Sequence, residues 1–212
     1  MGSYQTTMIL QLIAVLTSLY TAQSTGFQFV TCGSVIKLAN SESNIRLHSH
    51  EVKYGSGSGQ QSVTGAKFVD DVNSYWVVKA GHKDTCNRGT PIKCGSVLRL
   101  QHLQTRGYLH SHHFRSPLSN NQEVSCFGGD NTVGDTGDNW TVECSGTEWR
   151  RDEAVRLRHS DTNMYLHASG STYGRPIQGQ MEIAGIKQKS GGNEWKAMEG
   201  VYMEPVDGKN NL

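Results

Sequence analysis

Two pairs of histidines are the residues of this sequence best spaced for chemistry. His48 and His50 are two positions apart, as are His110 and His112. Residues two apart in a β-strand point to the same face, so both imidazoles of a pair could reach one metal ion. However, three histidines follow a leucine at equivalent places of a repeated pattern: Leu47-His48, Leu109-His110 and Leu166-His167. Such repetition favours scaffold residues that hydrogen-bond a neighbouring strand or loop, and we predict no metal site.

The sequence lacks the residue patterns that an enzyme of a common class needs. It contains neither a GxSxG nor an HExxH motif. The adjacent carboxylates Asp70-Asp71 and Asp152-Glu153 would point to opposite faces of a strand, so neither forms an acid–base couple. The glycine-rich residues 55–59 lack the Gly-Lys-Ser/Thr of a phosphate loop. We therefore predict a protein that is not an enzyme and that has no catalytic residues and no cofactor.

The elements that carry these residues recur three times along the chain. Residues 32–38 (CGSVIKL) return as 94–100 (CGSVLRL) and, more loosely, as 153–157, each alternating apolar and polar positions like a half-buried strand. Nine residues beyond the last leucine of each copy comes the Leu-His pair. A third strand-like run and a final tryptophan-led strand follow. The third runs centre on Val63, Val124 and Ile183, and the tryptophans are Trp76, Trp140 and Trp195.

Three four-stranded units of this kind can bury their apolar faces only together. We therefore predict an all-β fold, a β-trefoil with pseudo-threefold symmetry, over residues 25–206. Its repeats are expected at about 30–84, 92–146 and 150–204. A propeller of three blades would be too tightly curved. The three equivalent tryptophans are predicted to pack in the core, because a buried indole supplies a large apolar area.

The N-terminal residues have the pattern of a secretory signal. Residues 8–22 are mostly apolar, and Ala22 and Ser24 are the small residues that a signal peptidase requires, so residues 1–24 are predicted to be removed. Met1-Gly2 with Thr6 also fits N-myristoylation, although a hydrophobic run directly after it is unusual. No second long apolar run follows, so we predict no membrane span. Residues 207–212 are predicted to be a flexible tail.

Cysteines and charges narrow the environment and the partners. In an oxidising compartment the five cysteines allow up to two disulfides. Cys86 and Cys94 flank a turn-like segment and are the predicted pair, in a loop whose closure contributes roughly 2–3 kcal/mol. The pairing of Cys32, Cys126 and Cys144 stays open, as does the alternative of buried free thiols. Because twenty dispersed Lys and Arg are balanced by nineteen acids, nucleic-acid binding is excluded.

The loop after the second strand of each unit is where a trefoil is expected to display ligand contacts. The candidate ligand or partner residues there are Tyr54, Phe114, Tyr173 and Arg175. Asn139-Trp140-Thr141 is a formal N-glycosylation acceptor. It overlaps a strand-opening tryptophan, so we expect partial occupancy at most.

Several segments in order resemble the stromal cell-derived factor two family. They are the GSV[IL][KR]L openings, the LHSH strands, the YGSGSGQQSVTG loop (54–65), the CNRGTPIKCG connector (86–95), YGRPIQGQ and WKAMEG. This family is built of three MIR motifs, a repeat shared with luminal loops of protein O-mannosyltransferases, and the resemblance covers about residues 27–205. It implies a non-catalytic protein of endoplasmic-reticulum quality control and the unfolded protein response. The implied partners are a luminal Hsp40 co-chaperone, through it the Hsp70 chaperone, and misfolded or O-mannosylated clients.

The C-terminus departs from the retained members of that family. Residues 209–212 (KNNL) keep only the lysine and leucine of Lys-Asp-Glu-Leu, so both retention in the lumen and secretion remain open. We expect a monomer within a hetero-complex. The alternative function is a carbohydrate-binding, lectin-like trefoil that holds a mannose-type glycan.

Overall fold

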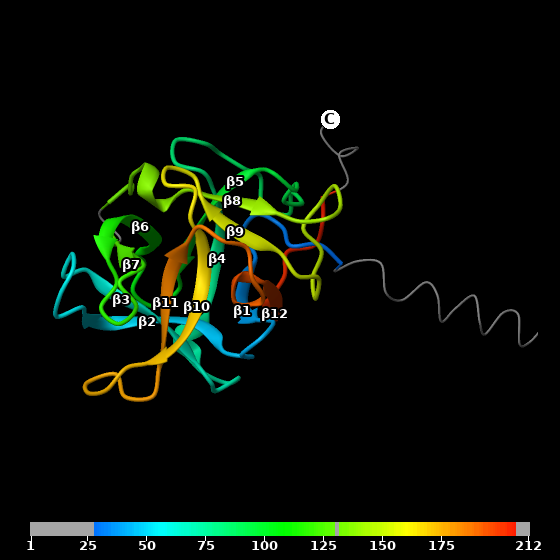
Figure 1. Cartoon of the computed structure of the whole chain (residues 1–212). Coiled ribbons are helices and arrows are strands. Elements are labelled where there is room, and N and C mark those ends of the chain that lie inside the picture. The colour runs from blue at the N-terminus through cyan, green and yellow to red at the C-terminus, as the bar shows by residue number, and fades with distance from the viewer. Residues whose placement is uncertain (1–27, 130–131, 207–212) are drawn as a thin grey trace, which may run out of the picture.

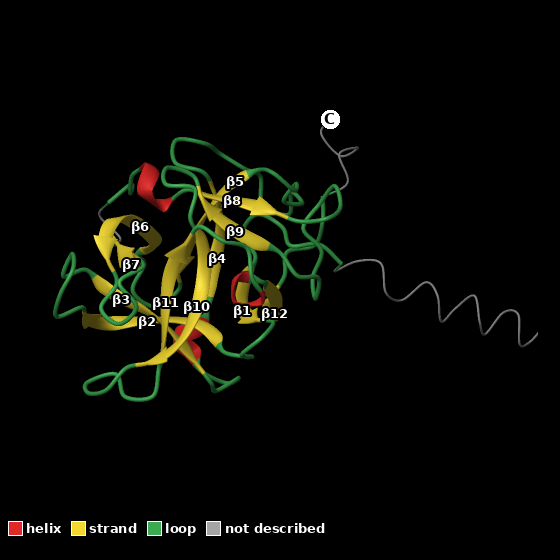
Figure 2. Cartoon of the chain, viewed as in Figure 1, coloured by secondary structure: helices red, strands yellow, loops and turns green. Residues whose placement is uncertain are grey.

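The computed structural model describes residues 28–129 and 132–206, which form twelve strands and three short 3-10 turns (Figures 1 and 2). The predicted signal peptide and C-terminal tail lie outside these residues. The elements fall into three units of four strands, each with one 3-10 turn before its last strand. The first unit has β1 (Val35–Asn40), β2 (Arg46–Lys53), β3 (Gln61–Ala66), η1 (Val72–Ser74) and β4 (Trp76–Ala80). The second has β5 (Val97–His102), β6 (Tyr108–Arg115), β7 (Gln122–Phe127), η2 (Thr136–Asp138) and β8 (Trp140–Glu143). The third has β9 (Arg156–His159), β10 (Tyr165–Thr172), β11 (Met181–Ile186), η3 (Gly191–Asn193) and β12 (Trp195–Val201).

The first and fourth strands of the three units form a closed barrel. Antiparallel pairs run from β12 to β1, β4, β5, β8 and β9 in that order. The ring closes through a bridge between Val155, just before β9, and Trp195 of β12. Closure leaves the barrel without an unpaired edge strand, which removes the usual site of strand-to-strand aggregation.

The second and third strands of each unit form a hairpin, and the three hairpins cap one end of the barrel. The hairpins are β2–β3, β6–β7 and β10–β11. Their third strands also pair with one another, β3 with β7, β7 with β11 and β11 with β3. This cyclic arrangement confirms the predicted β-trefoil with pseudo-threefold symmetry. Among the described residues no helix is long and apolar enough to cross a membrane.

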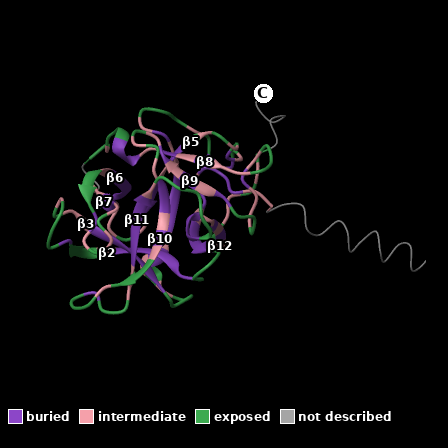
Figure 3. Cartoon of the chain, in the orientation of Figure 1, coloured by how far each residue is buried: buried purple, intermediate pink, exposed green. Residues whose placement is uncertain are grey.

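The tryptophans that open the fourth strands lie in the core, as predicted. The side chains of Trp76, Trp140 and Trp195 are fully buried. Figure 3 shows that buried segments lie along the strands and that exposed residues concentrate in the loops. Each indole N–H donates a hydrogen bond of 2.9 Å to the carbonyl of the leucine before the repeated histidine: Leu47, Leu109 and Leu166. Each tryptophan therefore ties the barrel strand of its unit to the hairpin of the same unit, with its one polar atom satisfied.

The predicted disulfide between Cys86 and Cys94 is wrong. Cys32 pairs with Cys86, with 6.2 Å between their Cα atoms, and Cys94 pairs with Cys144 at 5.4 Å. Cys126 is a buried free thiol, so that alternative holds for one cysteine only. Each bridge joins the start of a unit to the segment after its fourth strand. The two cysteines of the connector therefore serve different units.

Backbone hydrogen bonds explain why the connector does not close on itself. At its first half, Gly89 donates to the carbonyl of Cys32, and the N–H of Cys32 donates to Thr90. At its far end, the N–H of Cys94 donates to the carbonyl of Thr147, beyond the last strand of the second unit. Cys86 is thus held against the first unit and Cys94 against the second.

The third unit has no cysteine and is closed by a different contact. Arg151 stands where the other units have Cys32 and Cys94, counted back from the aligned leucines. Its guanidinium lies 3.8 Å from the centroid of the Tyr202 ring, which follows the fourth strand of that unit. Burial raises the pKa of the Tyr202 hydroxyl to about 12, although Arg151 opposes the shift. A cation–π contact thus occupies the place of a covalent bond.

Candidate functional site

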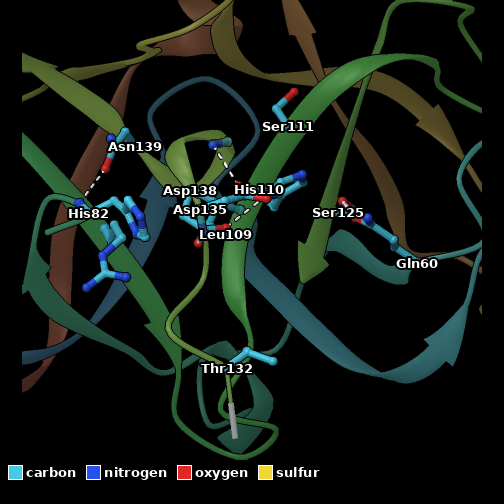
Figure 4. A network of polar contacts seen from close by, with 12 residues as sticks. Gln60, His82, Leu109, His110, Ser111, Ser125, Thr132, Asp135, Asp138 and Asn139 are labelled. Atoms are coloured by element: carbon cyan, nitrogen blue, oxygen red, sulfur yellow. Dashed lines mark hydrogen bonds and ion pairs between the residues drawn. The ribbon is translucent and has the colours of Figure 1, made fainter. Parts of the chain in front are cut away.

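Two of the repeated histidines, His48 and His110, bind a carboxylate at the 3-10 turn of their own unit, and Figure 4 shows His110 beside Asp138. His48 Nδ1 lies 2.6 Å from the carboxylate of Asp71, and His110 Nδ1 lies 2.9 Å from that of Asp138. The imidazole of His110 packs closely on the turn η2. A Cβ atom added at Gly137 would lie 2.9 Å from His110 Nδ1. A scaffold role is therefore confirmed for these two histidines.

One cluster on this turn has the composition of a metal site. A ligand atom from each of His110, Asp135 and Asp138 lies within 4.8 Å of the others. Asp138 already accepts the backbone N–H of Asp135 at 2.9 Å, and Asp135 accepts that of Gly137 at 2.8 Å. These bonds form the capping box of η2. Since the same carboxylates satisfy backbone donors of the turn, the cluster is explained as a cap and we assign it no ion.

A second set of polar residues, at the ends of the first strands, links neighbouring units. Asn40, His102 and His159 each donate to a backbone carbonyl in the 3-10 turn of another unit. The acceptors, each at 2.9 Å, are Gly192 for Asn40, Asn73 for His102 and Gly137 for His159. Burial lowers the pKa of His102 to about 4, although its bond to Asn73 opposes the shift. Asn40, His102 and His159 therefore hold neighbouring units together as uncharged side chains, and we call these three residues the pins.

The second histidine of each pair faces a hairpin. His50 Nδ1 lies 2.8 Å from His48 Nε2, and His112 Nε2 lies 2.9 Å from the carboxylate of Glu123. Glu123 is fully buried and also accepts the backbone N–H of Ser58 at 3.2 Å. Burial alone would raise the pKa of Glu123, but the hydrogen bonds from His112 and Ser58 lower it below its usual value. The carboxylate is therefore a fixed anion that holds the long loop of the first unit.

Two of the candidate ligand residues lie inside the hairpin cap. Tyr54 is 6% exposed, and its hydroxyl lies 2.8 Å from the carbonyl of Val63 and 2.9 Å from that of Val124. The ring of half-buried Tyr173 lies 6.3 Å from the ring of Tyr54. Burial raises the pKa of both hydroxyls. The Tyr54 ring is therefore not available as a stacking platform for a ligand from solvent.

The other two candidates are accessible. Phe114 is 50% exposed on β6 and borders a hollow of 370 Å³ together with Arg115 and Lys187. Arg175 is exposed in the loop after β10, next to Pro176. Phe114 is not the counterpart of the two tyrosines. Counted from the aligned leucines, that position in the second unit is Ser116, which is 2% exposed.

The third unit leaves a small hollow where the other units have a histidine pair. Ser169 occupies the position of His50 and His112, and a hollow of 270 Å³ lies beside it. His167 borders this hollow, and its Nδ1 is buried without a hydrogen-bond partner in the described part of the chain. Burial lowers the pKa of His167, while the neighbouring Gly192 backbone opposes the shift. The carboxylate of Glu42 lines the same hollow.

Asn139 of the formal glycosylation acceptor is one of the residues of the polar network around His110 in Figure 4. Half-buried Asn139 accepts the backbone N–H of His82 through its side-chain oxygen at 2.8 Å. The hydroxyl of Thr141, the third residue of the motif, lies 3.2 Å from the hydroxyl of Ser160. Because the asparagine side chain already has a structural partner, the low occupancy expected from the sequence remains our prediction.

Reasoning from the sequence missed the three 3-10 turns, although His102, His159 and Asn40 each donate a hydrogen bond to the backbone of one of them. A signal was present, because each turn is preceded by a residue that commonly caps a helix, five positions before the tryptophan. These residues are Asp71, Asp135 and Ser190. The pins at Asn40, His102 and His159 differ in residue type, so only their equal register could have identified them.

Comparisons with known proteins agree with this geometry. The profile of the MIR domain matches residues 28–148. Stromal cell-derived factor 2 of Mus musculus is 58% identical over 178 residues, which cover 84% of each chain. The crystal structure of the SDF2-like protein from Arabidopsis thaliana superposes with a TM-score of 0.82 at 50% identity, covering 84% of this chain and 99% of that one.

A more distant similarity extends to an enzyme complex. The structure of the S. cerevisiae protein O-mannosyltransferase Pmt1-Pmt2 complex bound to the sugar donor matches with a TM-score of 0.74 at 26% identity. The match covers 86% of this chain but 28% of that one. The similarity therefore concerns one part of the larger protein.

Proposed function

Because the chain belongs to the stromal cell-derived factor 2 family of MIR-domain proteins, we propose that it is a non-catalytic protein of endoplasmic-reticulum quality control. In this role it binds a luminal Hsp40 co-chaperone and, through it, the Hsp70 chaperone, together with misfolded or O-mannosylated clients. The observation that carries the proposal is the identity of 58% across 84% of the chain with a relative that is not named for a reaction.

Three features of the molecule support this reading. The polar clusters around the first two histidine pairs are occupied in holding turns and hairpins together, as His110 with Asp138 and His112 with Glu123 illustrate. Two disulfides suit an oxidising compartment such as the lumen. The likeness to part of a mannosyltransferase complex gives a reason to expect O-mannosylated clients. We further propose that residues 1–24 are removed as a signal peptide and that 25–206 form the mature domain.

A crosslinked pull-down from microsomes tests the adaptor role. The mature domain, tagged at its C-terminus and expressed with its own first 24 residues, should recover a luminal Hsp40 at near-stoichiometric yield. The Hsp70 should follow in amounts that depend on the Hsp40. A matched bait without residues 1–24 should recover neither, because it would not enter the lumen. Repeated failure of the full-length bait to recover an Hsp40 would refute the proposal.

A second experiment addresses retention in the lumen. We propose that residence in the lumen depends on binding to the Hsp40. The ratio of intracellular to secreted protein should then fall when the Hsp40 is depleted. An unchanged ratio would mean that residence in the lumen does not depend on the Hsp40.

A lectin-like function is the second candidate, and the hollow of the third unit favours it. Its 270 Å³ suits a single sugar ring, and both the buried Nδ1 of His167 and the carboxylate of Glu42 border it. A glycan array on the mature protein tests this function. Mannose-dependent binding that Glu42→Gln abolishes would favour the lectin, whereas no binding together with recovery of an Hsp40 would favour the adaptor.

A further inference from the structure

Two hollows adjoin the connector between the first and second units. One has a volume of 490 Å³ and the other 520 Å³. They share a short stretch of lining from the end of β4 and the connector: Lys79, Ala80, Asp84, Thr85 and Cys86. We call the residues that line either hollow the connector surface. The Cys32–Cys86 disulfide forms part of its wall, which fixes the connector against the barrel.

The connector surface gathers positive charge that is dispersed in the sequence. Among the residues that the structure describes, five Lys and Arg line it but only one acid does, Asp84. The five cations are Lys79, Lys83, Arg88, Lys93 and Arg99. In a chain whose formal net charge is +1, this imbalance makes the region a local site of positive potential.

Three of these cations are free to meet a ligand. Within residues 28–129 and 132–206, no ion pair is formed by Lys79, Lys83 or Lys93. Lys83 and Lys93 are exposed. Lys83 also has a left-handed backbone, with φ at 67°, where a glycine would be less strained. The connector therefore presents a charged side chain at a position that local conformation does not favour.

The two arginines are held in place and shape the surface. The guanidinium of Arg99 donates to the carbonyls of Ala80 at 3.0 Å and Val133 at 2.8 Å. The Nε of Arg88 lies 2.7 Å from the sulfur of Met203. The two arginines thus line the hollow of 490 Å³, while the exposed Lys83 and Lys93 line the hollow of 520 Å³.

Apolar side chains also line the connector surface. Val97 is 38% exposed at its edge, whereas Val77, Val78 and Ile92 are buried beneath it. Within the part of the chain that the structure describes, no aromatic residue lines either hollow. Single-stranded nucleic acid usually needs aromatic side chains on which bases stack, so this mixture of aliphatic and cationic groups suits a polypeptide better.

We propose that the connector surface binds an extended acidic peptide segment of a partner protein, one that alternates carboxylate and aliphatic side chains. The carboxylates would meet Lys79, Lys83 and Lys93, and an aliphatic group would cover the exposed Val97. The inference deepens the proposed adaptor function, on which it rests, by giving the chemistry of one partner segment. Its charge complementarity would act mainly on the association rate and on the choice of partner.

Fluorescence polarisation with purified protein tests the proposal. The probes are a labelled peptide that alternates Glu with Val or Leu, and the same peptide with Gln in place of Glu. The test variant is Lys83→Glu with Lys93→Glu, and the matched control is Lys53→Glu with Lys67→Glu, two exposed lysines that line neither hollow. Circular dichroism establishes that both variants keep the wild-type fold.

The acidic peptide should bind wild type and the control variant alike, and the test variant roughly tenfold more weakly. Its affinity should fall as salt rises from about 0.05 to about 0.5 M, whereas the Gln peptide should bind weakly throughout. Equal binding by both variants, or no binding by wild type, would overturn the proposal. So would a single-stranded RNA or an anionic vesicle that binds wild type more tightly than the peptide and is equally sensitive to the test variant.

The same variants in the microsomal pull-down separate this inference from the adaptor function. If wild type and both variants recover the Hsp40 but none binds the peptide, the proposal for the connector surface is refuted and the adaptor function is supported. If the peptide binds in a way that depends on Lys83 and Lys93 but no Hsp40 is recovered, the proposal for the connector surface is supported and the adaptor function is refuted.

Discussion

The first two units and the third unit of the barrel solve the same structural problem with different chemistry. The first two are each closed by a disulfide, Cys32–Cys86 and Cys94–Cys144. The third is closed by the contact of Arg151 with Tyr202 and by the pairing of its last strand, β12, with β1. In the first two, a carboxylate at the turn binds the repeated histidine, while Nδ1 of His167 in the third has no hydrogen-bond partner among the described residues.

The difference shows which contacts the fold requires and which it can exchange. The indole bond to the leucine carbonyl has the same length in all three units, so it belongs to the trefoil itself. The closing contact and the histidine partner vary, so they adjust the stability of one unit. The third unit is also where the variation leaves a hollow, whereas the connector after the first disulfide carries the cationic surface.

The disulfides provide the largest test of this comparison. Replacing Cys94 and Cys144 by alanine should lower the free energy of unfolding by about 4 kcal/mol, because the bridge closes a segment with a sequence separation of 50. Urea denaturation followed by tryptophan fluorescence measures the change. A loss below about 1 kcal/mol would mean that the second unit, like the third, is closed well enough without a covalent bond.

The pins between units predict a loss of stability in acid. Because burial holds the pKa of folded His102 at about 4 against about 6.5 when unfolded, the unfolded chain binds more protons between these values. The contribution of neutral His102 to the free energy of unfolding is complete above about pH 6.5. It is lost as pH falls to about 4, which lowers the free energy of unfolding by about 3 kcal/mol.

The first unit supplies the matched variant for that prediction, since Asn40 holds the equivalent place. His102→Asn should flatten the dependence of unfolding free energy on pH between about 4 and 6.5. Its stability at pH 7 should fall as well, because the ring that packs 5.0 Å from Trp76 is gone. Denaturation curves at several pH values measure both effects. An unchanged slope would assign the acid sensitivity to other groups.

Converting the second unit toward the third should have a smaller effect. Asp138→Asn copies Asn193 and weakens the bond to His110, at a cost of about 1–2 kcal/mol. Asp135→Asn is the control, since that carboxylate is 57% exposed and 3.7 Å from the histidine. The two unfolding free energies should differ clearly. Equal losses would show that the capping box, rather than the histidine, determines the cost.

The smallest expected change concerns the closing contact of the third unit. Arg151→Ala should cost about 1 kcal/mol, the value of a partly desolvated cation–π contact. Arg151→Lys should recover part of it, because an ammonium keeps the charge over the ring. Thermal unfolding of both variants is sufficient to measure this. A cost as large as that of removing the disulfide would make the two kinds of closure equivalent.

The sequence was sufficient to predict the architecture because repetition is visible without coordinates. Equal spacing of leucine, histidine and tryptophan in three copies fixes which residues share a position, and the buried Trp76, Trp140 and Trp195 confirm it. The same reasoning predicted scaffold histidines. It failed for Cys86 and Cys94, because closeness along the chain says little about which unit each cysteine faces.

Tertiary structure alone decided the partners of the polar groups. Whether Tyr54 faces solvent or the interior depends on how three hairpins meet, which no local pattern encodes. The cations of the connector surface are likewise spread between Lys79 and Arg99 in the sequence and become one patch only when β4, the connector and β5 fold together. The sequence by itself determined the repeated frame and its apolar core, because periodic burial leaves a periodic pattern. Only the fold decided which polar side chains satisfy one another and which remain available to a partner, because those contacts join residues that are distant along the chain.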